Sequence, residues 1–205
     1  LSVDEEERLI RWLCAHLDLT TLAILLCLFS GIRIGEVCAL NWNDFNFQEG
    51  TFSVTKTMQR VRTKGDPARK TEVQILTPKS DCSERRIPIP DNLMGLLKEH
   101  CVPGAFLTTG DKKAFVEPRT LENRFKRILE KAGIPDINFH AATRHTFATR
   151  CVEAGVDIKC LSEILGHADV SITLNRYVHT TMSLKSRNMA KLSGRFPLNG
   201  ITSRE

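Results

Sequence analysis

Apolar residues recur at helical spacing over the first 40 residues of the chain. Ser2 and Glu5 form the pattern of a capping box, which predicts that a helix begins there. The next apolar run is hydrophobic on nearly every side, which predicts a helix buried all round, and Gly31 is its expected C-terminal stop. The pattern therefore predicts three helices in this region, at 2–17, 20–30 and 34–40.

The period of the pattern changes over residues 44–89. Phe52 and Val54 alternate with polar residues, and a turn at 48–50 separates two such runs. Strands are therefore expected at 44–47, 51–55, 72–76 and 85–89. We interpret this segment as a small antiparallel sheet whose hairpin loops carry much of the positive charge.

Helical spacing returns after residue 90, with Gly133, Gly155 and Gly166 as the expected helix stops. Residues 102–117 show no clear period and are expected to be irregular. Helices are predicted at 91–99, 118–132, 142–154, 157–165, 171–178 and 183–193. We interpret residues 1–205 as one domain of the α+β class, mainly α, in which a helical domain carries a small antiparallel β-sheet.

The composition is that of an ordinary globular domain, with 41% hydrophobic and 26% charged residues. The apolar run at 22–29 is too short to span a bilayer, and no signal peptide is evident. The seven cysteines are odd in number and lack zinc-site spacing, so we interpret them as reduced core residues of a cytosolic protein. The chain begins within a helix-opening pattern and without an initiator Met, so we expect it to be part of a longer protein.

The positive charge is concentrated in one segment. Residues 56–86 contain nine basic and four acidic side chains, which accounts for the entire net charge of +5. A concentrated basic segment favours a polyanionic partner, although a solvated loop with incidental charge gives the same pattern.

Two segments place a cation where it can bind an anion. Arg33 is flanked by Gly31 and Gly35 directly after the buried helix, which puts a planar guanidinium at a well-anchored corner. Lys79 lies in the loop between the last two predicted strands, from where it can contact a phosphate or donate a proton. A surface arginine and a solvated lysine are the plain alternatives for these two segments.

Two further segments contain histidine, arginine and tyrosine. His140 and Arg144 are four residues apart near a helix start and share one helix face, whereas His145 points about a quarter turn away. His167 follows a helix stop, and Tyr177, the only tyrosine of the chain, comes ten residues later. Packed or capping histidines and a half-buried packing tyrosine are the alternatives here.

Together, the four segments resemble the signature of the tyrosine recombinase family, which includes phage and transposon integrases. In chain order they supply an arginine, a lysine, a histidine with an arginine, a histidine and a tyrosine. The resemblance covers about residues 1–192, and it is strongest to integrases of conjugative transposons and phages of low-GC Gram-positive bacteria. The matching stretches are GIRIGEVCALNWND, TPKSDCSERRIPIP, FHAATRHTFATRCVEAGVD and LSEILGHADVSITLNRYVH.

The resemblance implies the catalytic domain of a site-specific recombinase with the integrase-like DNA breaking–rejoining fold. In this family a tyrosine attacks a phosphodiester, which gives a 3′-phosphotyrosyl link and a free 5′-hydroxyl, without metal, ATP or another cofactor. Carried over to this chain, Tyr177 is the nucleophile, Arg33 and Arg144 hold the phosphate oxygens, and His167 donates a further hydrogen bond.

Two family roles fall on positions that are less regular in this chain. Lys79 would protonate the leaving 5′-oxygen, but its loop holds other lysines. His140 would help to take the proton from the tyrosine, whose free pKa of about 10 makes it a poor nucleophile. The family spaces this pair as His-x-x-Arg, whereas three residues separate His140 from Arg144. The extra residue can be tolerated on one helical face or absorbed in the preceding turn; the substitute, His145, is expected to have the wrong helical phase.

The resemblance also implies partners. Double-stranded DNA with recombination sites is the expected substrate, bound by a homotetramer when the protein is full length, and accessory excision or host factors are possible partners. The family's N-terminal core-binding and arm-binding domains are absent from residues 1–205, and the segment 183–192 resembles a tail that neighbouring protomers exchange. No membrane partner and a cytoplasmic, nucleoid-associated location are expected. The side chains expected to contact the DNA backbone are Lys56, Arg60, Arg62, Lys64, Arg69, Lys70, Arg85 and Arg86.

Two alternatives stay open on the sequence alone. An enzyme similar to type IB topoisomerases would share the tyrosine chemistry but relax DNA without exchanging strands. A catalytically inactive DNA-binding relic would keep the fold, and the altered spacing of His140 and Arg144 favours it. Formation of a covalent protein–DNA adduct separates the relic from either enzyme.

Overall fold

The computed structural model describes residues 1–63, 71–77, 84–177, 186 and 189–191. The chain begins with three helices, as predicted: α1 (Val3–Ala15), α2 (Leu19–Ser30) and α3 (Ile34–Ala39). The capping box of α1 is confirmed, because Ser2 Oγ accepts from the Glu5 amide and the Glu5 carboxylate accepts from the Ser2 amide. Helix α2 is buried on nearly all sides, as its unbroken apolar sequence predicted.

The strands form two antiparallel sheets rather than the single sheet that was predicted. Strands β1 (Phe45–Asn46), β2 (Thr51–Val54) and β5 (Arg85–Pro88) make one sheet in the order β1-β2-β5. Strands β3 (Thr57–Arg62) and β4 (Thr71–Leu76) pair separately. Strand β3 was missed because Met58 is its only fully buried residue, so its sequence lacks a strong apolar alternation.

The second half of the chain is helical. Helices α4 (Asp91–Glu99), α5 (Pro118–Lys131), α7 (Ile158–Leu165) and α8 (Val170–Tyr177) lie where the pattern predicted them. The helix predicted at 142–154 differs, because it begins with a π-helical turn (Ala141–His145) before α6 (Thr146–Ala154). Most of the helix predicted at 183–193 lies outside the described residues.

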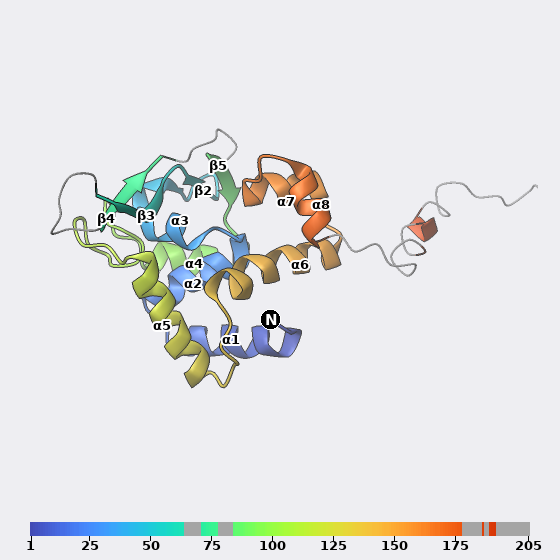
Figure 1. Ribbon diagram of the computed structural model, residues 1–205, viewed down its shortest axis with the longest axis horizontal. Helices are drawn as coiled ribbons and strands as arrows, with labels where there is room; N and C mark the ends of the chain where they lie inside the picture. Colours follow the sequence, from blue (N-terminus) through green and yellow to red (C-terminus); the bar gives the residue numbers. More distant parts are fainter. Residues whose placement is uncertain (64–70, 78–83, 178–185, 187–188, 192–205) are drawn as a thin grey trace, which may run out of the picture.

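Two hydrophobic clusters of unequal size organise the fold. The large cluster contains side chains of the five helices α1, α2, α3, α4 and α5, of strands from both sheets, and of the beginning of the π-helical turn. The small one contains Ala148, Leu161 and Leu165, with Phe147 and Tyr177 packed against it. In Figure 1, α7 and α8 accordingly lie together at the end of α6, on the side away from α1 and α5. Tyr177 is therefore placed by the smaller cluster, beside the main core.

The cysteines are more varied than predicted. Of the six that the structure describes, Cys27 and Cys38 are buried, whereas Cys14 and Cys160 are exposed. All six are free thiols. Among the described parts of the chain, every helix is too short or too polar to span a bilayer.

Candidate active site

The two arginines predicted from distant segments are brought to the same place. Arg144 is 2% exposed, and its guanidinium donates to the Gly31 carbonyl oxygen (2.8 Å) and the Leu165 carbonyl oxygen (2.6 Å). Arg33 donates to the Gly166 carbonyl oxygen at 3.3 Å. Each arginine is therefore held by the C-terminal end of a helix, where carbonyl groups lack helical partners.

Glycines allow these helices to approach one another closely. Gly31 ends α2 with a φ of 66°, and a Cβ there would lie 2.5 Å from Phe147 and 2.8 Å from Leu165. A Cβ at Gly35 would lie 2.6 Å from the Met58 carbonyl oxygen on β3. Gly31 therefore serves both backbone conformation and close packing, whereas Gly35 serves close packing alone.

A buried carboxylate holds the arginine cluster together. Glu36 is 3% exposed, and it accepts hydrogen bonds from Arg33 (2.8 Å) and from Arg85 (2.9 and 3.1 Å). Burial alone would raise the pKa of Glu36, but the hydrogen bonds and charges of Arg85 and Arg33 outweigh it and lower that pKa. No role was predicted for Glu36 from the sequence; its position directly after Gly31-Ile32-Arg33-Ile34-Gly35 was the available signal.

Arg85 lies elsewhere than predicted. It was expected at the DNA backbone, yet its side chain is 6% exposed, and it donates to the Ile164 carbonyl oxygen (2.6 Å) as well as to Glu36. The physical reason is that β5 passes beside α7, so the guanidinium is drawn to a buried carboxylate and a helix end. Arg85 therefore braces α7 against Glu36 and does not face solvent.

His167 stands at the exit of α7, as predicted. Gly166 ends the helix with a φ of 64°, and His167 Nδ1 lies 2.8 Å from the buried Thr173 hydroxyl oxygen on α8. Burial, with Arg144 and Arg33 nearby, lowers the pKa of His167 to about 4. The imidazole is therefore neutral at pH 7, and its Nδ1 is fixed by the contact with Thr173.

Tyr177 is the last residue of α8, and its hydroxyl lies 2.6 Å from His145 Nδ1. Burial raises the pKa of Tyr177, although Arg144 and Arg176 act against this effect. Burial followed by the charges of Arg176 and Arg144 lowers the pKa of His145. The pair is thus a neutral phenol beside a neutral imidazole at pH 7.

The prediction that His145 has the wrong helical phase is wrong. The residues from Ala141 to His145 form a π-helical turn, which takes one residue more than an α-helical turn. That turn accommodates the third residue between His140 and Arg144 and leaves Arg144 directed into the site. His140 packs edge-on against His145, with ring centroids 4.5 Å apart, and none of the hydrogen bonds among the described residues joins it to Tyr177.

The electrostatic balance of the site is positive. Partial burial and the neighbouring cations lower the pKa of His140 to about 4, and burial beside Arg33 lowers that of Arg144 to about 9. Glu36 is the carboxylate that acts on Arg144 in the opposite direction. Fixed guanidinium groups, neutral imidazoles and a phenol together suit the binding of an anion and attack on it by an oxygen nucleophile.

The remaining predicted cations lie on the strands or outside the described residues. Lys79, together with Lys64, Arg69 and Lys70, falls outside them. On the exposed strand surfaces, Arg60 is paired with Glu117 at 2.6 Å and Arg86 with Glu49. Lys56 and Arg62 are exposed as well.

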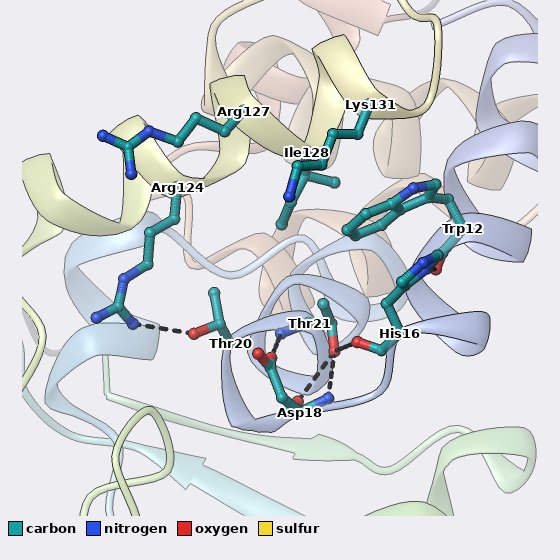
Figure 2. Close-up of a pocket in the computed structure, with 9 residues that line it drawn as sticks. All are labelled: Trp12, His16, Asp18, Thr20, Thr21, Arg124, Arg127, Ile128 and Lys131. Carbon is teal, nitrogen blue, oxygen red and sulfur yellow. Dashed lines mark hydrogen bonds between the residues drawn. The ribbon is translucent and has the colours of Figure 1, made fainter.

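A separate cleft of about 440 Å³ opens between α1 and α5, at the beginning of α2 (Figure 2). Arg124, Arg127 and Lys131 line it from α5, facing Trp12 and His16 from α1. Helix α2 has 12 residues, so its two ends are about 18 Å apart. The cleft therefore lies at the opposite end of α2 from Gly31 and the arginine cluster.

Known proteins with similar sequences point to one family. The phage integrase family pattern matches residues 1–183. A tyrosine recombinase XerC-like protein of Caldanaerobacter subterraneus subsp. tengcongensis is 34% identical over 192 residues, covering 84% of this chain and 48% of that protein. Tyrosine recombinase XerA of Pyrococcus furiosus is 30% identical over 180 residues, covering 84% of this chain and 54% of its own length. The chain thus spans about half the length of these curated relatives.

Solved structures give the same result. The Tn1549 transposon integrase, solved in complex with circular intermediate DNA, is similar with a TM-score of 0.74 and 25% identity. The match covers 94% of this chain and 66% of that one. The XerA recombinase crystal structure has a TM-score of 0.66 and 25% identity, covering 96% of this chain and 64% of its own. With the arginines, His167 and Tyr177 gathered in one site, the chain belongs to the phage integrase family, and the two relatives described above are tyrosine recombinases.

Proposed function

We propose that this chain is the catalytic domain of a site-specific DNA recombinase that cleaves and rejoins strands through a 3′-phosphotyrosyl intermediate. The observation that carries the proposal is the convergence of Arg33, Arg144, His167 and Tyr177. They come from four separate segments of the chain, and folding brings them around one positively charged site.

The chemistry follows from the kinds of group in the site. The Tyr177 oxygen attacks a phosphorus atom of the DNA backbone, the bond from phosphorus to the 5′-oxygen breaks, and the 3′-phosphate stays on the tyrosine. Arg33 and Arg144 stabilise the charge on the non-bridging oxygens, since their guanidinium groups are already fixed by carbonyl oxygens. His167 donates a further hydrogen bond to the same phosphate through Nε2.

The leaving 5′-oxygen must gain a proton. Lys79 is our candidate for this general acid, by its place in the motif between β4 and β5. Attack by a 5′-hydroxyl from another strand then reverses the step. Because the covalent link conserves the energy of the broken bond, the proposed reaction uses no ATP, and because Arg33 and Arg144 stabilise the phosphate charge, it uses no metal ion.

The exposed cations of the strands are proposed to follow the DNA backbone. Lys56, Arg60, Arg62 and Arg86 are exposed on this part of the protein, and such contacts give affinity that depends strongly on salt. A homotetramer on two DNA sites, with exchange of the segment 183–192 between protomers, is part of the same proposal. Deleting that segment should prevent tetramer formation on DNA, and normal tetramers would contradict the exchange.

Covalent trapping tests the function. The protein would be produced from the full reading frame that contains this chain, and its binding sites would be selected from a random-sequence duplex pool. Selected duplexes nicked near the cleavage point would then be incubated with wild-type protein and with Tyr177→Phe. We expect a slow-migrating adduct on a denaturing gel for the wild type alone. Binding without any adduct would instead support a non-catalytic DNA-binding protein.

A further inference from the structure

His145 occupies a position in the site that the motif does not assign to it. Its Nδ1 lies 2.6 Å from the Tyr177 hydroxyl oxygen, and the centroids of the two rings are 5.6 Å apart. His140 is the family's candidate for this task, but it contacts the His145 ring and not the tyrosine.

The surroundings of this contact favour the uncharged forms of both His145 and Tyr177. Arg144 and His140 lie on the same helix as His145, and Arg176 and Tyr177 face it from α8. Burial and the arginine charges lower the pKa of His145, and burial raises that of Tyr177. At neutral pH the phenol therefore keeps its proton, and the tautomer of His145 with hydrogen on Nε2 can accept that proton in a hydrogen bond at Nδ1.

His145 reaches the tyrosine from the last residue of the π-helical turn. An α-helical turn through Ala141–His145 would leave this side chain rotated away from Arg144 by about 100°. In the structure this stretch is a π-helical turn, from which both Arg144 and His145 reach the site. The additional residue that separates His140 from Arg144 is thus linked to a new neighbour for the nucleophile.

We propose that His145 is a catalytic residue, whose Nδ1 receives the Tyr177 proton as the tyrosine oxygen bonds to phosphorus. The O–H bond breaks and an N–H bond forms at Nδ1, while the bond from phosphorus to the 5′-oxygen breaks and that oxygen takes a proton from the general acid. On reversal, the imidazolium returns its proton to the tyrosine oxygen. His140 is a positioning residue that supports the His145 ring edge-on. This inference rests on the proposed recombinase chemistry.

The first experiment needs no DNA. The chain would be labelled with ¹⁵N-histidine, and long-range ¹H–¹⁵N correlation spectra would show which ring nitrogen of His145 carries hydrogen at pH 7. His145→Asn identifies the signal. We expect hydrogen on Nε2 and an unprotonated Nδ1 whose shift changes in Tyr177→Phe. A hydrogen on Nδ1 would overturn the proposal, because the phenol could not then donate to it.

The second experiment measures single-turnover cleavage of the selected nicked duplex by the full-length protein. His145→Asn keeps a hydrogen-bond acceptor near the Nδ1 position but cannot take a proton. His145→Phe keeps the volume of the ring, and it can neither accept a hydrogen bond there nor take a proton. We expect both variants to cleave about 100-fold more slowly than wild type, or slower. His100→Asn, at the residue that follows α4, is the matched control and should cleave as wild type does.

A modified DNA distinguishes protonation of the leaving group from deprotonation of the tyrosine. In a duplex with sulfur in place of the bridging 5′-oxygen, the leaving group departs without a proton, so Lys79→Ala should recover cleavage while His145→Asn should not. Cleavage by His145→Asn at the wild-type rate would show that His145 only accepts a hydrogen bond. Faster cleavage by His145→Phe than by the wild type would show that His145 restrains the tyrosine. Either result overturns the proposal. If the wild type forms no adduct, the recombinase function itself fails, and this inference fails with it.

Discussion

The arginines of this chain fall into two groups that differ in what surrounds their charge. Arg144 and Arg85 are buried at 2% and 6% exposure, and each donates to a carbonyl oxygen at a helix end. Arg60 and Arg86 are exposed on the strands and pair with the partly exposed Glu117 and the exposed Glu49. The first group is fixed before any ligand arrives, whereas the second can reorient in solvent.

The difference indicates a division of labour. A fixed guanidinium stabilises charge that develops at one point without having to reorganise, which is what transition-state stabilisation requires. An exposed cation contributes general attraction to a polyanion, which salt screens. Sequence alone does not separate the two, because Arg85 and Arg86 are adjacent and belong to different groups.

The largest effect is expected from breaking the buried ion pair. Glu36→Gln leaves Arg85 and Arg33 without their buried counter-charge and should lower the free energy of unfolding by about 3–5 kcal/mol. Glu49→Gln, which breaks the exposed pair with Arg86, should cost at most about 1 kcal/mol. Urea unfolding of both variants measures the comparison, and equal losses would contradict the distinction between the groups.

Replacing a fixed arginine by lysine should affect the reaction more than binding. Arg144→Lys cannot reproduce two carbonyl contacts and a fork toward a phosphate, so cleavage should slow by about 10²- to 10³-fold. Arg62→Lys keeps its charge on an exposed strand and should cleave nearly as wild type does. Adduct formation over time provides the rates, and a normal rate for Arg144→Lys would remove this arginine from the mechanism.

The next largest effect is expected at Gly31, where the turn before Arg33 is closely packed. Gly31→Ala must accommodate a methyl group 2.5 Å from Phe147 in addition to a positive φ, and should destabilise the protein by about 2–4 kcal/mol. Gly133 has the same φ of 66° but open space around its Cβ position, so Gly133→Ala should cost only about 1 kcal/mol. Thermal unfolding of the pair isolates the steric part, and similar losses would show that the corner is not tightly packed.

The neutral His167 should make stability depend on pH. Its folded pKa of about 4 lies below the unfolded value, so the unfolded chain gains this proton first as the pH falls. The contribution of the neutral His167 to the free energy of unfolding is fully present above about pH 6.5 and declines as the pH falls toward about 4. His167→Gln should flatten this part of the curve, measured by urea unfolding at several pH values, while His16→Gln on the exposed end of α1 should leave it unchanged.

The smallest effect is expected from the exposed arginines, on the salt dependence of DNA affinity. Arg62→Ala should reduce the slope of log affinity against log salt concentration by about 0.9 if this side chain contacts one DNA phosphate. Fluorescence anisotropy with a selected duplex at several salt concentrations gives the slope. An unchanged slope would place Arg62 away from the DNA and narrow the proposed interface.

Much of the fold could be predicted because it rests on local patterns. The helix stop at Gly31 and the buried character of α2 followed from an unbroken apolar run ended by glycine. The chemical types in the site were also predicted, since Arg33, Arg144, His167 and Tyr177 lie in motifs that the sequence displays directly. The separate β3–β4 pair was not, because β3 has little apolar alternation of its own.

The sequence by itself determined the order of the helices and of the strands β1, β2, β4 and β5, together with the side chains that are proposed to bind and attack a phosphate. The tertiary structure decided which of those side chains meet. Arg85 turns inward because Glu36 is buried beside it, and charges pair according to proximity in the folded chain. His145 meets Tyr177, 32 residues further along the chain, because folding brings the end of α8 beside the π-helical turn, and such long-range packing leaves no local pattern in the sequence.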